Sequence, residues 1–409
     1  MVGGGVRSHC GRPTALARNH STARFATLDA RDSSSGDGLV SARAHVQYLN
    51  GMTVRVGILG CGSIARSAHL PSLLRTRDSA VIAIADADAA NLSAAQAIVR
   101  DAKAVRDYAD VLAMPDVDAV IVALPPALHA DAAIAALERG KHVYVEKPLA
   151  TTSRDAARMV AAARRTTLTS MVGFNYRFHP IVQAARARLA AGAIGTPIGI
   201  RSVFATAAKP IASWKQRRAS GGGVLLDLAV HHVDLVHFLL DAATVDVSAD
   251  VRSVRSEHDT ASVHLRLTNG SAASSMFSLS AVEEDRIEVY GTAGKVTIDR
   301  YGSLRAVVTA PRARGAFGNA ISRLAGELAE LPAAVRKRRA PMHDPSFPAA
   351  IQAFVRAVRD RTPGSPSFGD GLRAAAVIDA AEASAQSGRV VAVEVQQGAL
   401  PSRADRAGV

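Results

Sequence analysis

The helical stretch Gly223–Leu240 carries the residues best suited to acid–base chemistry. At 3.6 residues per turn, Asp227, His231 and Asp234 fall within an arc of about 60°. A buried carboxylate one turn from an imidazole can fix its tautomer and raise its basicity, as a general base requires. The same pair could instead be a satisfied core contact that only fastens the helix. The other histidines of the stretch point elsewhere, so no metal site is expected.

Lys147 is a second candidate, because it follows the apolar strand His142–Glu146 and precedes Pro148. Its ammonium is expected at the carboxyl edge of a parallel sheet, where such sheets bind ligands. From there it could hold or polarise a substrate oxygen. The alternative is an exposed lysine in a Lys-Pro turn, with Glu146 pairing with it or capping the strand.

A dinucleotide-binding turn is predicted in Thr53–Ala65, where an apolar strand runs into a glycine turn. Gly60 suits the tight turn, Gly62 lets the backbone approach a pyrophosphate, and Ala65 replaces the third glycine of the motif. Gly-Cys-Gly is also an ordinary tight turn. However, Asp86 ends the next apolar run twenty-one residues after Ala65 and is placed to accept from both ribose hydroxyls. The joint spacing favours the dinucleotide site.

Several polar residues beyond the predicted sheet could contact a substrate. Asn175, Tyr176 and Arg177 lie where the first domain ends and could bond to a hydroxyl-rich molecule. Arg177 could instead be an interdomain clamp. Trp214 and Lys215 precede a glycine-rich loop that could form a lid or only a long surface loop.

Composition excludes several classes of function. More than half of the formal net charge of +13 lies in residues 1–51 and 311–340, and basic residues are not interleaved with aromatics, so no nucleic-acid partner is expected. The longest uncharged apolar run, Ala119–Leu128, is too short for a membrane span and contains two prolines. Cys10 and Cys61 cannot form a disulfide framework, which favours a reducing, cytoplasmic location.

The chain is predicted to be an α/β protein of two domains. Residues 1–51 are expected to be a disordered extension, and Met52 could be the true start. Residues 52–173 alternate apolar strands with helices, which predicts a doubly wound parallel sheet of the Rossmann type. Its predicted strands are Val54–Leu59, Val81–Ala85, Ala119–Leu124, His142–Glu146 and Thr169–Val172. Its predicted helices are Ile64–Leu74, Asn91–Val99, His129–Glu138 and Arg154–Arg164.

Residues 174–395 predict a second α/β domain with a large, mostly antiparallel open sheet. Its strands are expected in Thr196–Thr206, Thr244–Ser256, Ala261–Thr268, Ser271–Ser280, Asp285–Tyr290 and Lys295–Arg300. Helices are expected at Gly223–Leu240, Ser346–Asp360 and Gly371–Ser387, and residues 396–409 form a disordered tail. Residues 311–341 are a probable insertion with a basic amphipathic helix, which would pack on its own domain or a partner rather than lie on a membrane.

These motifs together resemble the Gfo/Idh/MocA family, named for glucose–fructose oxidoreductase, inositol dehydrogenase and rhizopine catabolism. The resemblance covers about Thr53 to Val395 and includes six motifs. They are Gly60–Ala65, Leu124–His129, Gly140–Leu149, Asn175–Phe178, Gly221–Asp227 with His231 and Asp234, and Asp370–Arg373. Pro126 departs from the family, which often has Asn there, and removes one hydrogen-bond donor near the cofactor.

The resemblance implies an N-terminal Rossmann domain, a C-terminal domain whose open sheet mediates homo-oligomers, and NAD(H) or NADP(H) in the crevice between them. It implies Lys147, Asp227 and His231 as the catalytic group, and a cis bond before Pro148. The predicted cofactor residues are Gly60, Gly62, Ser63, Ile64, Ala65, Asp86, Leu124, Pro125, His129, Glu146 and Lys147. The predicted substrate residues are Asn175, Arg177, Trp214, Asp227 and His231.

The expected function is hydride transfer between NAD(P) and a secondary alcohol or ketone of a sugar, cyclitol or sugar derivative. NAD is preferred to NADP, because Asp86 would repel a 2′-phosphate and Ala87 offers no compensating arginine. Two alternatives remain. One is a hydrolase or lyase that oxidises its substrate transiently with bound NAD, and the other is a dinucleotide-binding protein that regulates a partner.

Overall fold

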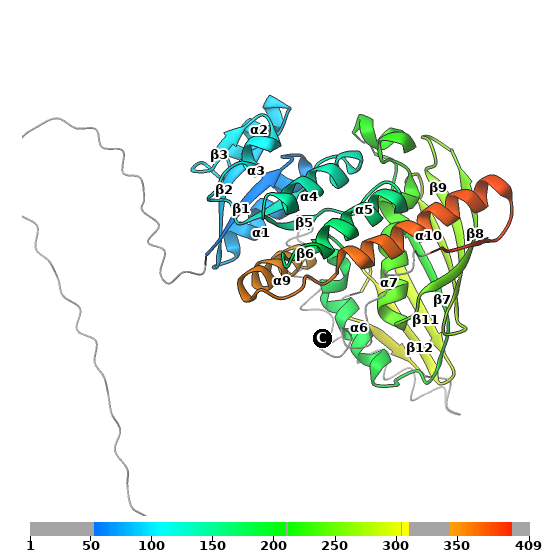
Figure 1. The fold of residues 1–409 in the computed structure, drawn as a ribbon. Coiled ribbons are helices and arrows are strands. Elements are labelled where there is room, and N and C mark those ends of the chain that lie inside the picture. Colours follow the sequence, from blue (N-terminus) through cyan, green and yellow to red (C-terminus); the bar gives the residue numbers. More distant parts are fainter. Residues whose placement is uncertain (1–52, 210–211, 304, 311–343, 395–409) are drawn as a thin grey trace, which may run out of the picture. The chain divides into compact units, whose positions relative to one another are not determined.

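The computed structural model describes residues 53–209, 212–303, 305–310 and 344–394. These residues form two β-sheets with helices packed against them (Figure 1). The predictions for residues 1–51, for the insertion 311–341 and for the tail 396–409 concern residues outside these ranges.

The first sheet has six parallel strands in the order β3-β2-β1-β4-β5-β6. The chain winds in one direction from β1 to β3 and in the other from β4 to β6, which confirms the predicted Rossmann sheet. The strands are β1 Val54–Leu59, β2 Ser79–Ala85, β3 Lys103–Val105, β4 Ala119–Val122, β5 His142–Val145 and β6 Ser170–Val172. The helices are α1 Leu70–Arg75, α2 Ala89–Gln96, α3 Tyr108–Leu112, α4 His129–Glu138 and α5 Ser153–Arg164.

Most of the predicted elements of this sheet are confirmed, and β1 and α4 have the predicted limits. Strand β3 and helix α3 were not predicted. They span three and five residues, which is too short for a hydrophobic period to show.

The chain leaves β1 through the predicted glycine turn. Gly60 has φ +95°, a conformation that favours glycine, and a Cβ there would lie 2.5 Å from the carbonyl oxygen of Ala123. The end of β1 can therefore approach the end of β4. A π-helical turn, Ala65–His69, follows at once and continues into α1.

The second sheet has eight strands in the order β13-β12-β11-β7-β10-β9-β8-β14. Strands β7 and β10 are parallel and the other neighbours are antiparallel, so the predicted mostly antiparallel sheet is confirmed. The strands are β7 Pro197–Ala205, β8 Thr244–Arg252, β9 Thr260–Leu267, β10 Ala272–Ser278, β11 Glu284–Gly291, β12 Gly294–Asp299, β13 Val307–Thr309 and β14 Val391–Ala392.

One face of this sheet is covered by helices. In β9 the side chains of Val263, Leu265 and Leu267 are buried, and the residues between them are exposed, as the alternating sequence predicts. Helices α6 Pro180–Ala190, α7 Val230–Leu240 and α10 Phe368–Ser387 contact the strands on the buried side (Figure 1). Helix α6 was not predicted.

Helix α9, Ser346–Asp360, returns to the first sheet. Its residues Ile351, Phe354 and Val355 are buried in the same hydrophobic cluster as Ile58 and Tyr144. The sequence predicted this helix with its limits and assigned it to the second domain. In the structure it helps to cover the first sheet.

The stretch Arg218–Leu240 is long and apolar enough to cross a membrane by length and composition. However, 78% of its most apolar window is buried inside the protein. It is therefore the core helix that the sequence predicted. Its first turn, Leu225–Ala229, is π-helical, and α7 continues from Val230.

Candidate active site

The ammonium of Lys147 meets the helical segment that carries Asp227. Lys147 follows β5, and its Nζ donates to the backbone oxygen of Asp227 at 2.8 Å and to Oδ1 at 3.1 Å. The peptide bond before Pro148 is cis, as the resemblance implied. The contact joins the carboxyl edge of the first sheet to the second half of the chain.

A second ammonium binds the same carboxylate. Lys215 Nζ lies 3.0 Å from Oδ1 and 2.9 Å from Oδ2 of Asp227. Burial would raise the pKa of Asp227, but Lys147 and Lys215 together hold this pKa well below its usual range. The lysine–aspartate cluster, formed by Lys147, Lys215 and Asp227, therefore contains two cations and one carboxylate. Its net positive charge suits an oxygen that gains negative charge in a reaction.

The loop that carries Lys215 is fixed by close packing. A Cβ on Gly222 would lie 2.1 Å from the backbone oxygen of Lys215, so only glycine lets the chain pass there. Arg218 forms an ion pair with Glu382 on α10 and donates to the backbone oxygen of Thr151 at 2.9 Å. The sequence predicted either a lid or a long surface loop. These contacts fasten the loop to both halves of the chain.

His231 lies four residues beyond Asp227 and is almost completely buried, with 5% of its surface exposed. Its ring stacks on that of Tyr176, with centroids 4.1 Å apart and planes inclined by 14°. Burial, together with the charges of Lys147 and Arg300, lowers the pKa of His231 well below its ordinary value. The imidazole is therefore neutral at physiological pH and can accept a proton.

The predicted orientation of His231 by Asp227 is not what the structure shows. Among the described residues, the carboxylate of Asp227 bonds to the two lysines, and Nδ1 of His231 has no hydrogen-bond partner. Two physical reasons explain the difference. The first turn is π-helical, so the four-residue spacing is not one α-helical turn. An ammonium also makes a stronger, charge-assisted bond to a carboxylate than a neutral imidazole does.

Arg177 and Asn175 are occupied by protein contacts. The Arg177 guanidinium bonds to Asp234 on α7 at 2.8 and 2.5 Å and to Asp370 on α10 at 3.0 Å. The amide nitrogen of Asn175 donates to Ser346 Oγ at 2.7 Å. These contacts favour the clamp over the predicted substrate role of Arg177, and they occupy the carboxylate of Asp234. Trp214 is partly buried, with Lys215 Nζ 5.4 Å from its ring.

The glycine turn and Asp86 fit a dinucleotide. A Cβ added to Gly62 would meet no atom within 4 Å, so the backbone is open at the point where a pyrophosphate is expected. Ser63 is exposed and Ile64 partly exposed at the start of the helix, while Ala65 is fully buried against the strand. Asp86 lies at the end of β2, where its carboxylate accepts from Cys61 N–H at 2.8 Å. This places the acidic group beside the glycine turn.

An arginine does reach this region, contrary to the expectation drawn from Ala87. The guanidinium of Arg106, which follows β3, contacts the backbone oxygen of Ala87. No sequence pattern predicts this contact, because it depends on the pairing of β2 with β3.

His129 and Glu146 make buried contacts near the ends of β4 and β5. The His129 ring lies 2.8 Å from the backbone oxygen of Leu124 and 2.9 Å from that of Pro148, and burial lowers its pKa. It thus links the segments that follow β4 and β5. Glu146 lies 2.8 Å from Nε2 of His69, a fully buried residue that sequence reasoning missed. Nothing in the helical pattern around His69 distinguishes it from other core positions.

The predicted absence of a metal site concerns the whole chain, and the structure addresses only part of it. In the described ranges, no group of three or more His, Cys, Asp or Glu side chains is arranged to hold a metal ion.

The doubly wound sheet, its open glycine turn and the acidic Asp86 at the end of β2 are the features of a dinucleotide-binding fold. A family model described as "Oxidoreductase family, NAD-binding Rossmann fold" matches residues 54–174, and the GFO/IDH/MocA C-terminal domain matches residues 182–297. The chain belongs to the Gfo/Idh/MocA family of NAD(P)-dependent oxidoreductases.

Relatives and solved structures agree with this assignment. The chain is 34% identical over 249 residues to dTDP-3,4-didehydro-2,6-dideoxy-alpha-D-glucose 3-reductase of Saccharopolyspora spinosa, covering 60% of this chain and 75% of the relative. It is 29% identical over 362 residues to inositol 2-dehydrogenase of Rhizobium meliloti, covering 84% of this chain and all of the relative. A levoglucosan dehydrogenase in complex with NADH and levoglucosan has the same fold, with a TM-score of 0.70, 23% identity and coverage of 84% and 100%.

The open backbone at Gly62 leads to a direct test of the cofactor site. We expect Gly62→Ala to leave the melting temperature nearly unchanged, because the new methyl group meets no protein atom. The same methyl group would obstruct a pyrophosphate, so the Kd for NADH, followed by fluorescence titration, should rise about tenfold or more. An unchanged Kd would show that the cofactor does not approach the backbone at this glycine.

Proposed function

We propose that the protein is an NAD-dependent dehydrogenase that acts on a secondary alcohol of a sugar, cyclitol or sugar derivative. The observation that carries this proposal is the contact of Lys147 with Asp227 beside the neutral His231. Relatives named as inositol 2-dehydrogenase and as a deoxysugar 3-reductase support the substrate class.

Each residue of the proposed group has a role that follows from its charge. In the direction of oxidation, His231 accepts the hydroxyl proton, because its imidazole is neutral. Lys147 donates a hydrogen bond to the substrate oxygen and stabilises its negative charge. Asp227 holds Lys147 in place, and Lys215 offsets the carboxylate charge that would otherwise cancel that of Lys147. The bound nicotinamide supplies the hydride acceptor.

The same cluster favours substrates that become anionic during the reaction. Two ammonium groups face one carboxylate, so the cluster attracts an alkoxide more strongly than a neutral hydroxyl. Differential binding of this kind accelerates the chemical step rather than only strengthening substrate binding.

We further infer that the protein works as a cytoplasmic homo-oligomer through the exposed face of the second sheet. Val203 on β7 and Met276 on β10 are paired across strands on that face, and Met276 is 44% exposed. Tyr290 on β11 is 37% exposed on the same side. Apolar side chains in such a position are suited to contact another copy of the chain.

Loss of the proposed acid–base groups should abolish turnover. Lys147→Ala and His231→Ala should each lower kcat/KM for NAD⁺ reduction by about a hundredfold or more, because positioned proton-transfer groups contribute that much. Absorbance of NADH would be followed with a panel that includes myo-inositol, levoglucosan and aldonates. Lys103→Ala, an exposed lysine on β3, is the matched control and should keep full activity. Activity within tenfold of the unchanged chain in both variants would contradict the assignment, and product formation without net NADH would indicate transient oxidation instead.

The cofactor preference can be measured without a substrate. NADH should bind more tightly than NADPH, because the Asp86 carboxylate would repel a 2′-phosphate. Asp86→Ser should reduce or reverse this preference, since Arg106 beside Ala87 would then face the phosphate without an opposing carboxylate. Asp101→Asn, an exposed carboxylate, serves as the control. Tighter binding of NADPH to the unchanged chain would overturn the assignment.

The subunit arrangement has its own test. The mass in solution, from light scattering, should be a multiple of the 42.6 kDa chain, and Met276→Asp should lower it by placing a charge in the apolar contact. A monomeric unchanged chain, or an unaltered mass in the variant, would count against this face as the interface.

A further inference from the structure

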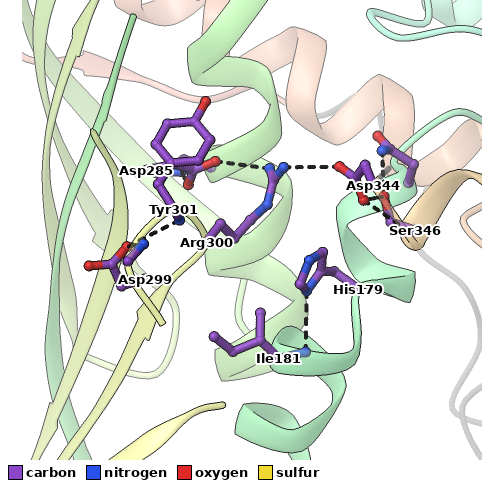
Figure 2. A network of polar contacts seen from close by, with 11 residues as sticks. His179, Ile181, Asp285, Asp299, Arg300, Tyr301, Asp344 and Ser346 are labelled. Carbon is purple, nitrogen blue, oxygen red and sulfur yellow. Dashed lines mark hydrogen bonds and ion pairs between the residues drawn. The ribbon is translucent and has the colours of Figure 1, made fainter. Parts of the chain in front are cut away.

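Arg300 is a buried cation next to Tyr176, the residue that stacks on His231. It follows β12, and its side chain is 8% exposed. The guanidinium lies 2.9 Å from Oδ2 of Asp285 and 3.0 Å from Oδ2 of Asp344, and Figure 2 shows it between these two carboxylates. A buried arginine that is paired on both sides has little freedom to move.

The same guanidinium stacks on Tyr176. Its central carbon lies 3.3 Å from the centroid of the Tyr176 ring, and the His231 ring lies 4.1 Å from that centroid. Two groups so close to one centroid cannot share a face of the ring, because their atoms would overlap. Tyr176 is therefore enclosed between Arg300 and His231. The cation faces the side of Tyr176 that is remote from the imidazole.

The sequence builds this arrangement from segments far apart in the chain. Pairing of β11 with β12 places Arg300 beside Asp285, and the Arg300 N–H donates to the Asp285 backbone oxygen at 2.9 Å. Asp344 accepts from Ser346 Oγ at 2.6 Å, as Figure 2 shows. Ser346 in turn accepts from Asn175, the neighbour of Tyr176. The polar contacts thus connect the arginine to the turn that carries the stacked ring.

We propose that Arg300 is a positioning residue for His231, which acts through the ring of Tyr176 to fix the plane of the imidazole and keep it uncharged. This rests on the proposed role of His231 as the proton acceptor. Arg300 would contact neither substrate nor cofactor in this role.

Several charged groups face His231, and their signs explain why Arg300 matters. Lys147 after β5 and Arg300 after β12 disfavour a proton on the ring, while Asp227 on the preceding turn favours one. His232 is also close, with its Nε2 3.1 Å from Asp285 Oδ1, and Tyr176 separates the ring from Arg300. Burial acts in the same direction as the two cations. Arg300 is the cation on the far side of Tyr176. A single substitution can remove its charge without changing the lysine–aspartate cluster.

The test is a titration of the His231 imidazole in the whole protein without substrate. The protein would be labelled at histidine Cε1 and titrated by NMR from about pH 4.5 to 9, with His231→Gln to assign the resonance. We expect Arg300→Met to raise the titration midpoint of His231 by about one pH unit, because a nearby positive charge is lost. Arg300→Lys keeps the charge and should leave the midpoint close to that of the unchanged chain.

A second variant covers the case in which Arg300→Met does not fold, since it leaves the carboxylates of Asp285 and Asp344 without their arginine. Arg300→Met combined with Asp344→Asn removes one of these carboxylates, while Asp285 keeps its contact with His232, and the midpoint should still rise. Asp344→Asn alone is the matched control and should leave the midpoint unchanged or lower it. If a folded variant without Arg300 has the same titration midpoint of His231 as the unchanged chain, the proposal is overturned. A loss of stability without a change of midpoint would show that Arg300 is only structural.

The titration separates this proposal from the proposed function. If none of the tested substrates lets the unchanged chain reduce NAD⁺, the dehydrogenase proposal fails. The titration midpoints of His231 can still be compared in that case. If turnover is found, the acidic limb of the pH profile of kcat/KM should move to higher pH in Arg300→Met, by about the same amount as the NMR midpoint.

Discussion

The contact between Lys147 and Asp227 is the interaction on which the rest of the site depends. It joins the carboxyl edge of the parallel sheet, where a dinucleotide fits, to the helix that carries His231. A buried carboxylate needs a partner, and a lysine at a strand end needs an acceptor, so each group satisfies the other. Because the bond extends to the backbone oxygen of Asp227, it fixes the position of the helix start and not only that of a side chain.

The proposed mechanism relies on two charge arrangements. Lys147 and Lys215 share the carboxylate of Asp227, so the cluster has the net positive charge that would stabilise a developing alkoxide. His231 is buried against Tyr176 with Arg300 beyond it, which favours the neutral imidazole. An imidazole must be neutral before it accepts a proton, and positive charge stabilises an alkoxide as it forms. In the proposed mechanism, His231 meets the first requirement and the lysine–aspartate cluster meets the second.

Much of the fold could be predicted because its signals are local. Apolar runs with glycine stops gave β1 and α4 with their limits, and the alternation in β9 gave the exposed and buried faces of the second sheet. The site was harder to predict, because its contacts join distant segments. Lys147 and Asp227 could be named as candidates, but their bond, the second lysine and the Arg300 stack depend on how two sheets are assembled. The expected Asp227–His231 pair failed because the helix begins with a π-helical turn and two lysines compete for the carboxylate. Helix α9 was assigned to the second domain but packs with strands of the first sheet, since an amphipathic pattern does not say which core receives it.

A crystal structure of the protein with bound NADH would show whether Lys147 and His231 face the cofactor. We expect the nicotinamide ring to lie at the carboxyl edge of the first sheet, with Nζ of Lys147 and the His231 imidazole both facing the space beside its reactive carbon. A nicotinamide ring bound away from these two side chains, or an Asp227 that has lost its contact with Lys147 in the complex, would contradict it.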